Sequence, residues 1–189
     1  MHHSTFLTLK LDEMVSWYQK VAGLTPVHYA AGEAAWLTND EANHRIALIT
    51  HPKTKAPVDK PTSAGLHHVA FEYASFDQWI DNYSRLKHAG IMPFMCLDHG
   101  ITMSMYYADP EGNGVEIQFD SFGDWAVSKE WMWASLEFAA NPIGSWFDPD
   151  KIVAAREEGL GAAEIHDRAR SGKYAPERPP TSILLPEVY

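Results

Sequence analysis

An internal repeat restricts the fold of this chain more than any other feature of its sequence. Two histidines followed by strand-forming residues open each copy, as His2-His3-Ser4-Thr5-Phe6 and as His67-His68-Val69-Ala70-Phe71. Aligning the second histidine of each pair keeps the apolar residues that follow in register. The repeat therefore predicts a fold built from two copies of one supersecondary unit, covering about residues 3–120.

Each copy continues as a helix. Apolar residues recur at helical spacing after each opening strand, and a glycine ends each run, Gly23 in the first copy and Gly90 in the second. Ser75 and Gln78 have the spacing of a capping box at the start of the second helix. Both copies therefore predict a strand followed by a helix.

Each copy closes with sequence rich in strand-forming residues. In the second copy the segment 109–114, D-P-E-G-N-G, indicates a turn because Pro presets its φ angle and Gly or Asn tolerates a positive one. We therefore predict an α+β fold of two tandem βαβββ modules, about residues 1–51 and 65–120, with a polar linker at 52–63. The two modules are expected to form one curved mixed-sheet cavity within a domain of residues 1–120.

Residues 121–189 do not continue the repeat and are expected to form a C-terminal extension, packed on the domain or on a neighbouring subunit. Several of the chain's 7 tryptophans lie there and need packing partners. Asp148 and Pro149 suit the N-cap and first position of a short helix, a second helix is expected over Ala162–Arg170, and residues 176–189 are expected to be an extended arm. The extension could cap the cavity or form a subunit interface, and its apolar content favours a homo-oligomer.

Composition narrows the classes of partner. The formal charge of −10 repels phosphate backbones and anionic lipid, so we expect a small-molecule partner and neither nucleic acid nor a membrane. A lone cysteine, Cys96, builds no disulfide or thiolate zinc site within one chain, and we expect it to fill the core. The 10 histidines suit a metal held by nitrogen and oxygen ligands. With no apolar run near about 20 residues and no recognisable signal peptide, we expect a cytoplasmic protein.

The repeat also places candidate metal ligands. Side chains alternate along a strand, so one histidine of each pair can face the cavity. Glu116 lies between apolar neighbours in a predicted strand, and a buried carboxylate needs a positive partner such as a metal. Two histidines and one carboxylate form the facial triad of non-heme iron oxygenases. In the alternative interpretation His3 is a tag remnant or surface residue, His68 a core residue and Glu116 outward-facing, but their matched positions in the repeat favour the triad.

The pattern resembles the vicinal oxygen chelate superfamily, and within it the type I extradiol catechol dioxygenases that have a single pair of βαβββ modules. The resemblance covers residues 3 to about 120 and is strongest at 106–116, Y-Y-A-D-P-E-G-N-G-V-E. In that family the ligand histidine directly precedes the apolar strand residues. The resemblance therefore implies His3, His68 and Glu116 as metal ligands, with Fe(II), or alternatively Mn(II), as the cofactor.

Three further roles follow from the resemblance. His44 matches the acid/base histidine, and a pKa near 6.5 lets histidine exchange a proton near neutral pH. His99 matches a histidine that hydrogen-bonds the reacting oxygen, and Tyr106 a tyrosine that hydrogen-bonds the substrate. The implied reaction inserts both atoms of O2 into a catechol-type diol, including bicyclic ones such as 2,3-dihydroxybiphenyl, and gives a hydroxymuconic semialdehyde-type product.

Two alternatives share the fold. A glyoxalase-like isomerase or lyase would use Ni, Zn or Mn with a fourth ligand, but Ala47 stands at the pseudo-symmetric position of Glu116 and cannot ligate a metal. A drug-binding resistance protein would need no metal. Among the remaining histidines, His51 is the reserve for the acid/base role. The following are expected on the surface: His28, His88 and His166.

Overall fold

The computed structural model describes residues 2–186, which divide into two compact units. One unit comprises the described residues of Met1–Val69, Ala108–Val115 and Leu184–Tyr189. The other comprises Ala70–Tyr107 and Glu116–Ile183. The second unit thus joins most of the second repeat copy to the C-terminal extension.

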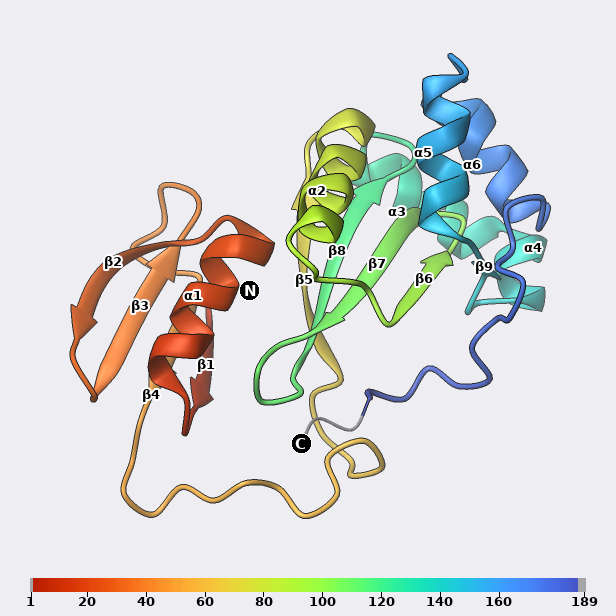
Figure 1. Cartoon of the computed structure of the whole chain (residues 1–189). Coiled ribbons are helices and arrows are strands. Elements are labelled where there is room, and N and C mark those ends of the chain that lie inside the picture. The colour runs from red at the N-terminus through yellow and green to blue at the C-terminus, as the bar shows by residue number, and fades with distance from the viewer. Residues whose placement is uncertain (1, 187–189) are drawn as a thin grey trace. The chain divides into compact units, whose positions relative to one another are not determined.

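The first repeat copy forms a βαβββ module within the first unit. Its elements are β1 (Ser4–Leu7), α1 (Leu11–Ala22), β2 (Thr25–Ala30), β3 (Ala34–Thr38) and β4 (Ile46–Ile49). The sheet order is β1-β4-β3-β2, with β1 parallel to β4 and the other pairs antiparallel, and α1 packs against β3 and β4 (Figure 1). Gly23 ends α1 as expected, since its φ of 66° is left-handed and its N–H bonds to the Tyr18 carbonyl.

The second repeat copy has the same succession of elements. These are β5 (His68–Tyr73), α2 (Phe76–His88), β6 (Met95–Asp98), β7 (Thr102–Ala108) and β8 (Gly114–Asp120). They lie in the order β5-β8-β7-β6, which reproduces β1-β4-β3-β2 strand for strand. Ser75 caps α2 by accepting a bond from Gln78 N, and buried Trp79 fixes this helix to the sheet by donating to the Ile117 carbonyl at 3.0 Å. The α+β class and the duplicated βαβββ modules are confirmed.

The extension begins with elements that the sequence reasoning did not foresee. These are α3 (Trp125–Ala134), α4 (Leu136–Ala140) and β9 (Ser145–Trp146), of which β9 pairs with β6 and adds a fifth strand to the second sheet (Figure 1). The two predicted helices follow as α5 (Pro149–Glu157) and α6 (Ala162–Arg170). Residues 176–186 carry no regular secondary structure, and the rest of the expected arm, 187–189, lies outside the described residues.

Burial corrects one expectation about the histidines. His166 was expected on the surface but is only 8% exposed, because it lies on the inner face of α6 with Ile165 and Ala169. His28 and His88 are exposed, as expected. Cys96 is buried in β6, which confirms it as a core residue. Within residues 2–186, every helix is too short or too polar to cross a membrane.

Candidate active site

Three of the predicted site residues come together in the second unit. Tyr106 on β7 donates its phenolic hydrogen to Glu116 Oε1 on β8 at 2.8 Å. Tyr106 Oη also lies 2.8 Å from Nε2 of His99, which follows the end of β6. Because the phenol has one hydrogen and gives it to the carboxylate, His99 must carry its hydrogen on Nε2 and donate it to Tyr106. The result is a directed chain of hydrogen bonds from imidazole to phenol to carboxylate.

Burial fixes the protonation state at the centre of this chain. Tyr106 and Glu116 are 4% and 5% exposed. Burial first, and then the charge and hydrogen bond of Glu116, raise the pKa of Tyr106 far above its ordinary value. Tyr106 therefore stays a hydrogen-bond donor throughout the neutral pH range.

The hydrogen-bonded chain opens onto a cavity of about 520 Å³ within the second unit. This volume lies in the range of small-molecule sites, about 300–1,000 Å³. Strands β5, β7 and β8 and the residues after β6 supply one side of the cavity, and the extension supplies the other. The lining residues are Glu72, His99, Ile101, Thr102, Tyr106, Glu116, Gln118, Asp120, Trp125, Ser128, Lys129, Met132, Phe138 and Pro142.

Two other predicted residues meet in the first unit. The rings of His3 and His44 lie 4.3 Å apart between centroids, and His2 Nδ1 lies 3.2 Å from His3 Nδ1. Partial burial, followed by the charges of the neighbouring histidines, lowers the pKa of His44. His44 is therefore biased toward its neutral form, which can accept a proton at pH 7. His51, the reserve candidate, is exposed and accepts a bond from Lys53 N at 3.1 Å.

The sixth predicted residue, His68, opens β5, the strand next to β8 in the sheet. Its Nδ1 lies 2.8 Å from that of His67. Gly114, at the start of β8, approaches this pair so closely that a Cβ on it would lie 2.3 Å from the His67 carbonyl oxygen and 3.0 Å from His68 Cβ. Only glycine permits this approach, so the G-V-E sequence that ends the repeat has a packing role as well as carrying Glu116.

The predicted metal ligands have donor atoms that suit a transition-metal ion. Two imidazoles and a buried carboxylate supply the nitrogen and oxygen donors that suit Fe(II) or Mn(II), so the residues fit such an ion. Within residues 2–186, no three His, Cys, Asp or Glu side chains are grouped as a metal site. His3, His68 and Glu116 therefore stay predicted ligands. Ala47 is 2% exposed and paired with Thr5 and Trp36, and it offers no donor, as the sequence indicated.

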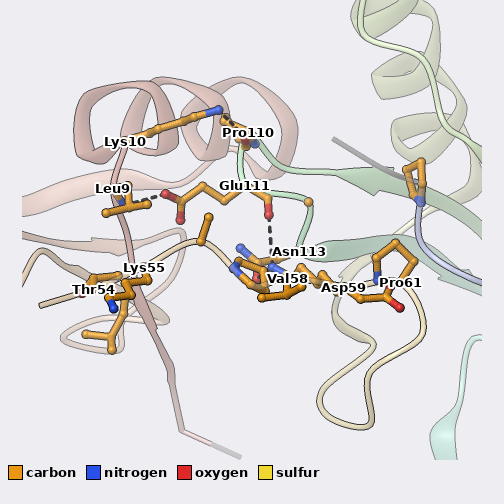
Figure 2. Close-up of a pocket in the computed structure, with 16 residues that line it drawn as sticks. Leu9, Lys10, Thr54, Lys55, Val58, Asp59, Pro61, Pro110, Glu111 and Asn113 are labelled. Carbon is orange, nitrogen blue, oxygen red and sulfur yellow. Dashed lines mark hydrogen bonds between the residues drawn. The ribbon is translucent and has the colours of Figure 1, made fainter. Parts of the chain in front are cut away.

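A second cavity, of about 560 Å³, lies in the first unit (Figure 2). The linker forms one side of it and the turn at 110–113 the other, where Glu111 accepts a bond from Leu9 N at 2.5 Å. Lys10 Nζ donates to the Pro110 carbonyl at 2.9 Å. None of the predicted site residues is among its described lining residues.

The sequence reasoning missed the residues that the extension contributes to the candidate site. Trp125 and Met132 on α3 and Phe138 on α4 line the same cavity as Glu116. The high aromatic content of residues 121–189 was the available signal, but it did not distinguish a cavity wall from an interface.

Comparisons with known proteins extend these observations. Residues 1–117 match the family model described as Glyoxalase/Bleomycin resistance protein/Dioxygenase superfamily. Two curated proteins of Rhodococcus globerulus are similar over most of the chain. Biphenyl-2,3-diol 1,2-dioxygenase 3 is 36% identical over 88% of this chain and 87% of its own length, and biphenyl-2,3-diol 1,2-dioxygenase 2 is 34% identical over 97% and 95%. A solved glyoxylase/bleomycin resistance protein/dioxygenase domain from Frankia sp. EAN1pec shares the fold with a TM-score of 0.54 at 18% identity, over 64% of this chain and 90% of its own.

Proposed function

The chain belongs to the Glyoxalase/Bleomycin resistance protein/Dioxygenase superfamily, and we propose that within it the chain is an Fe(II)-dependent extradiol dioxygenase that cleaves the ring of catechol-type diols. The observation that carries the proposal is the His99–Tyr106–Glu116 hydrogen-bonded chain on a cavity of small-molecule size. It is supported by the identity of more than a third with a biphenyl-2,3-diol 1,2-dioxygenase over most of the chain.

The proposed metal ligands are His3, His68 and Glu116. Held by them, an iron ion would supply a redox-active Lewis acid with coordination positions open to the diol and to O2. Tyr106 orients the Glu116 carboxylate by its hydrogen bond, as partners of metal-binding carboxylates commonly do. Mn(II) suits the same donors.

His44 is the proposed acid/base group, and His99 is proposed to act by hydrogen bonding. His44, with its lowered pKa, is neutral near pH 7 and can accept a proton from a substrate hydroxyl. His99 donates to Tyr106 Oη and so keeps the phenol hydrogen directed at Glu116. The reaction needs no external reductant because both atoms of O2 enter the product, a hydroxymuconic semialdehyde-type compound. Homo-oligomerisation, expected from the extension, stays a prediction.

The test compares two neighbouring tyrosines. Protein purified without air is loaded with Fe(II), mixed with 2,3-dihydroxybiphenyl or catechol, and followed by oxygen uptake and the absorbance of the yellow product. We expect uptake by the wild type and about a 10- to 100-fold lower rate in Tyr106→Phe, which loses the bond to Glu116. Tyr107→Phe is the matched control, because Tyr107 is also buried but its hydroxyl donates to the sulfur of Met105, at 3.8 Å, and not to a carboxylate.

Two results would contradict the proposal. If neither 2,3-dihydroxybiphenyl nor catechol gives oxygen uptake, the proposed dioxygenase activity is wrong. Equal rates in the Tyr106→Phe and Tyr107→Phe variants would remove the role assigned to the hydrogen-bonded chain.

A further inference from the structure

The cavity of the second unit has two chemically different sides. The strand side presents the polar chain of His99, Tyr106 and Glu116. The extension side presents mainly apolar groups, Met132 from α3 and Phe138 from α4 among them. A ligand with one polar end and one apolar end therefore matches the cavity.

The apolar side is fixed to the polar side through α3. Buried Ser128 donates to Asp120 Oδ2 on β8 at 2.5 Å, and Trp125 Nε1 donates to Glu72 on β5 at 2.9 Å. Asp124 caps the helix by accepting bonds from two backbone N–H groups of its first turn. Helix α3, which lines the cavity, is thus attached to two strands of the sheet.

A close contact joins α3 to the segment that carries His99. The ring of Trp131 lies against Gly100, where a Cβ would come within 2.5 Å of it. The same ring is edge-on to Phe138, with centroids 6.1 Å apart. Trp131 of the extension therefore packs directly on the residue after His99.

The size of the cavity exceeds what one ring needs. A cavity of about 150 Å³ is enough to hold benzene in an apolar protein interior, whereas this one measures about 520 Å³. Trp125 and Met132 line it while 72% and 44% exposed, so apolar surface is available for a ligand to cover. A second ring, or an apolar substituent of similar size, would bury that surface.

The charges around the cavity restrict which substituents the substrate can carry. Among its described lining residues are the carboxylates of Glu72, Glu116 and Asp120 and a single cation, Lys129. An acidic lining disfavours a substrate whose substituent is itself a carboxylate. Lys129 is the one charged residue that the extension contributes to this described lining, so the three carboxylates of the strands make the lining acidic as a whole and favour a substituent that is uncharged as well as apolar.

We propose that α3 and α4 form the binding wall for the part of the substrate remote from its hydroxyl groups, with Met132 and Phe138 as specificity-determining residues for uncharged, aryl-substituted catechols. The inference rests on the proposed dioxygenase function and adds the residues of the extension that distinguish between its substrates. It also gives the extension a direct role in the site, in addition to any role in subunit contacts.

The test measures discrimination between substrates by the iron-loaded protein. In Met132→Ala we expect kcat/KM to fall about tenfold more for 2,3-dihydroxybiphenyl than for catechol, since an apolar contact of this size discriminates by about 10- to 200-fold. Met92→Ala is the matched control, because Met92 is 51% exposed in the same unit and lies outside this cavity. We also expect wild-type kcat/KM for 3,4-dihydroxyphenylacetate to be at least about tenfold below that for 2,3-dihydroxybiphenyl.

Binding is measured in parallel, so that failure of the wall and failure of the dioxygenase function are distinguishable. Calorimetry gives the affinity of the metal-free protein for 2,3-dihydroxybiphenyl. Weaker binding in Met132→Ala, with no turnover in any variant, would support the wall and overturn the dioxygenase function. If Met132→Ala and Phe138→Ala both keep the wild-type ratio of kcat/KM for 2,3-dihydroxybiphenyl to that for catechol, and the wild-type affinity, α3 and α4 do not form the binding wall. Efficient cleavage of 3,4-dihydroxyphenylacetate would show that the site does not select uncharged substrates.

Discussion

At the scale of single residues, Asp98 and His166 form a buried titratable pair beside the candidate site. Asp98, at the end of β6, is 1% exposed, and its Oδ1 lies 3.6 Å from His166 Nε2, beyond hydrogen-bond distance. Within residues 2–186, Asp98 Oδ2 and His166 Nε2 have no hydrogen-bond partner. Burial raises the pKa of Asp98 to about 7, against the lowering effect of the Gly100 N–H bond and of Arg170, and burial lowers the pKa of His166. Near neutral pH His166 is therefore biased toward its neutral form, whereas Asp98 is mostly protonated only below about pH 7.

The pair predicts how Asp98→Asn changes stability with pH. An aspartate whose pKa is raised on folding binds more protons in the folded than in the unfolded state between about pH 4 and 7, so its contribution to stability is lost as pH rises through that window. Asn cannot ionise and keeps an oxygen that can accept the Gly100 N–H bond. Relative to wild type, we expect Asp98→Asn to gain about 2–3 kcal/mol in the free energy of unfolding from pH 5 to pH 8.

Urea unfolding followed by tryptophan fluorescence measures this difference. Because Asp98 and His166 lie 3.6 Å apart, the difference reports the titration of the pair. Asp59→Asn, at an exposed linker residue, is the control and should give the same difference from wild type at both pH values. A difference between Asp98→Asn and wild type that does not change with pH would show that Asp98 is ionised in the folded protein.

At the scale of secondary-structure elements, the contact between β8 and the start of β5 determines where His68 lies. A Cβ on Gly114 would lie 2.3 Å from a backbone oxygen and 2.8 Å from Leu185 Cδ2. Backbone cannot yield as a flexible side chain does, so Gly114→Ala should cost about 1–3 kcal/mol through overpacking. Because the displaced segment carries His68, we also expect weaker metal binding.

Gly65→Ala is the matched control for Gly114→Ala. Gly65 precedes the same strand, and a Cβ there meets nothing within 4 Å. Denaturant unfolding gives the stability of each variant, and metal content after dialysis gives the retention of iron. If Gly114→Ala unfolds like Gly65→Ala, the close contact between β8 and β5 does not exist in solution.

The elements also show which parts of the molecule sequence reasoning could reach. The repeat predicted both modules because strand, capped helix and closing strands recur at matched positions, and Ser75 and Gly23 act as the caps that their residue types indicate. Helix α3 was missed because its apolar residues do not form one stripe: Trp133 is 89% exposed, whereas Ser128 is the buried residue. Only Asp124, as an N-cap, marked its start.

The residues in and near the candidate site also include some that the sequence could predict and one that it could not. His99, Tyr106 and Glu116 were predicted from motif positions, and the structure places them in one hydrogen-bonded chain. The buried position of His166 could not be predicted from residue type, since histidine is intermediate in its tendency to be buried and its burial here depends on how α6 packs on β6 and β9. Tertiary packing, absent from the local sequence, decides such cases.

At the scale of the whole molecule, the proposed ligands connect metal binding to stability. An ion that binds the folded chain and not the unfolded one stabilises it by about 2.7 kcal/mol at 100 times its Kd. For a chain of 189 residues this corresponds to a rise in Tm of roughly 5–10 °C. We expect Mn(II), which is not oxidised by air as readily as Fe(II), to produce this rise in the wild type.

The repeat supplies its own controls for this prediction, because each proposed ligand histidine has a neighbouring histidine in the sequence. Alanine at His3 or at His68 should abolish the rise in Tm, whereas alanine at His2 or at His67 should retain most of it. Differential scanning fluorimetry with and without Mn(II) measures all four variants. A rise in His3→Ala equal to that in His2→Ala would remove His3 from the ligand set, and the same comparison at His68 and His67 decides the second ligand independently.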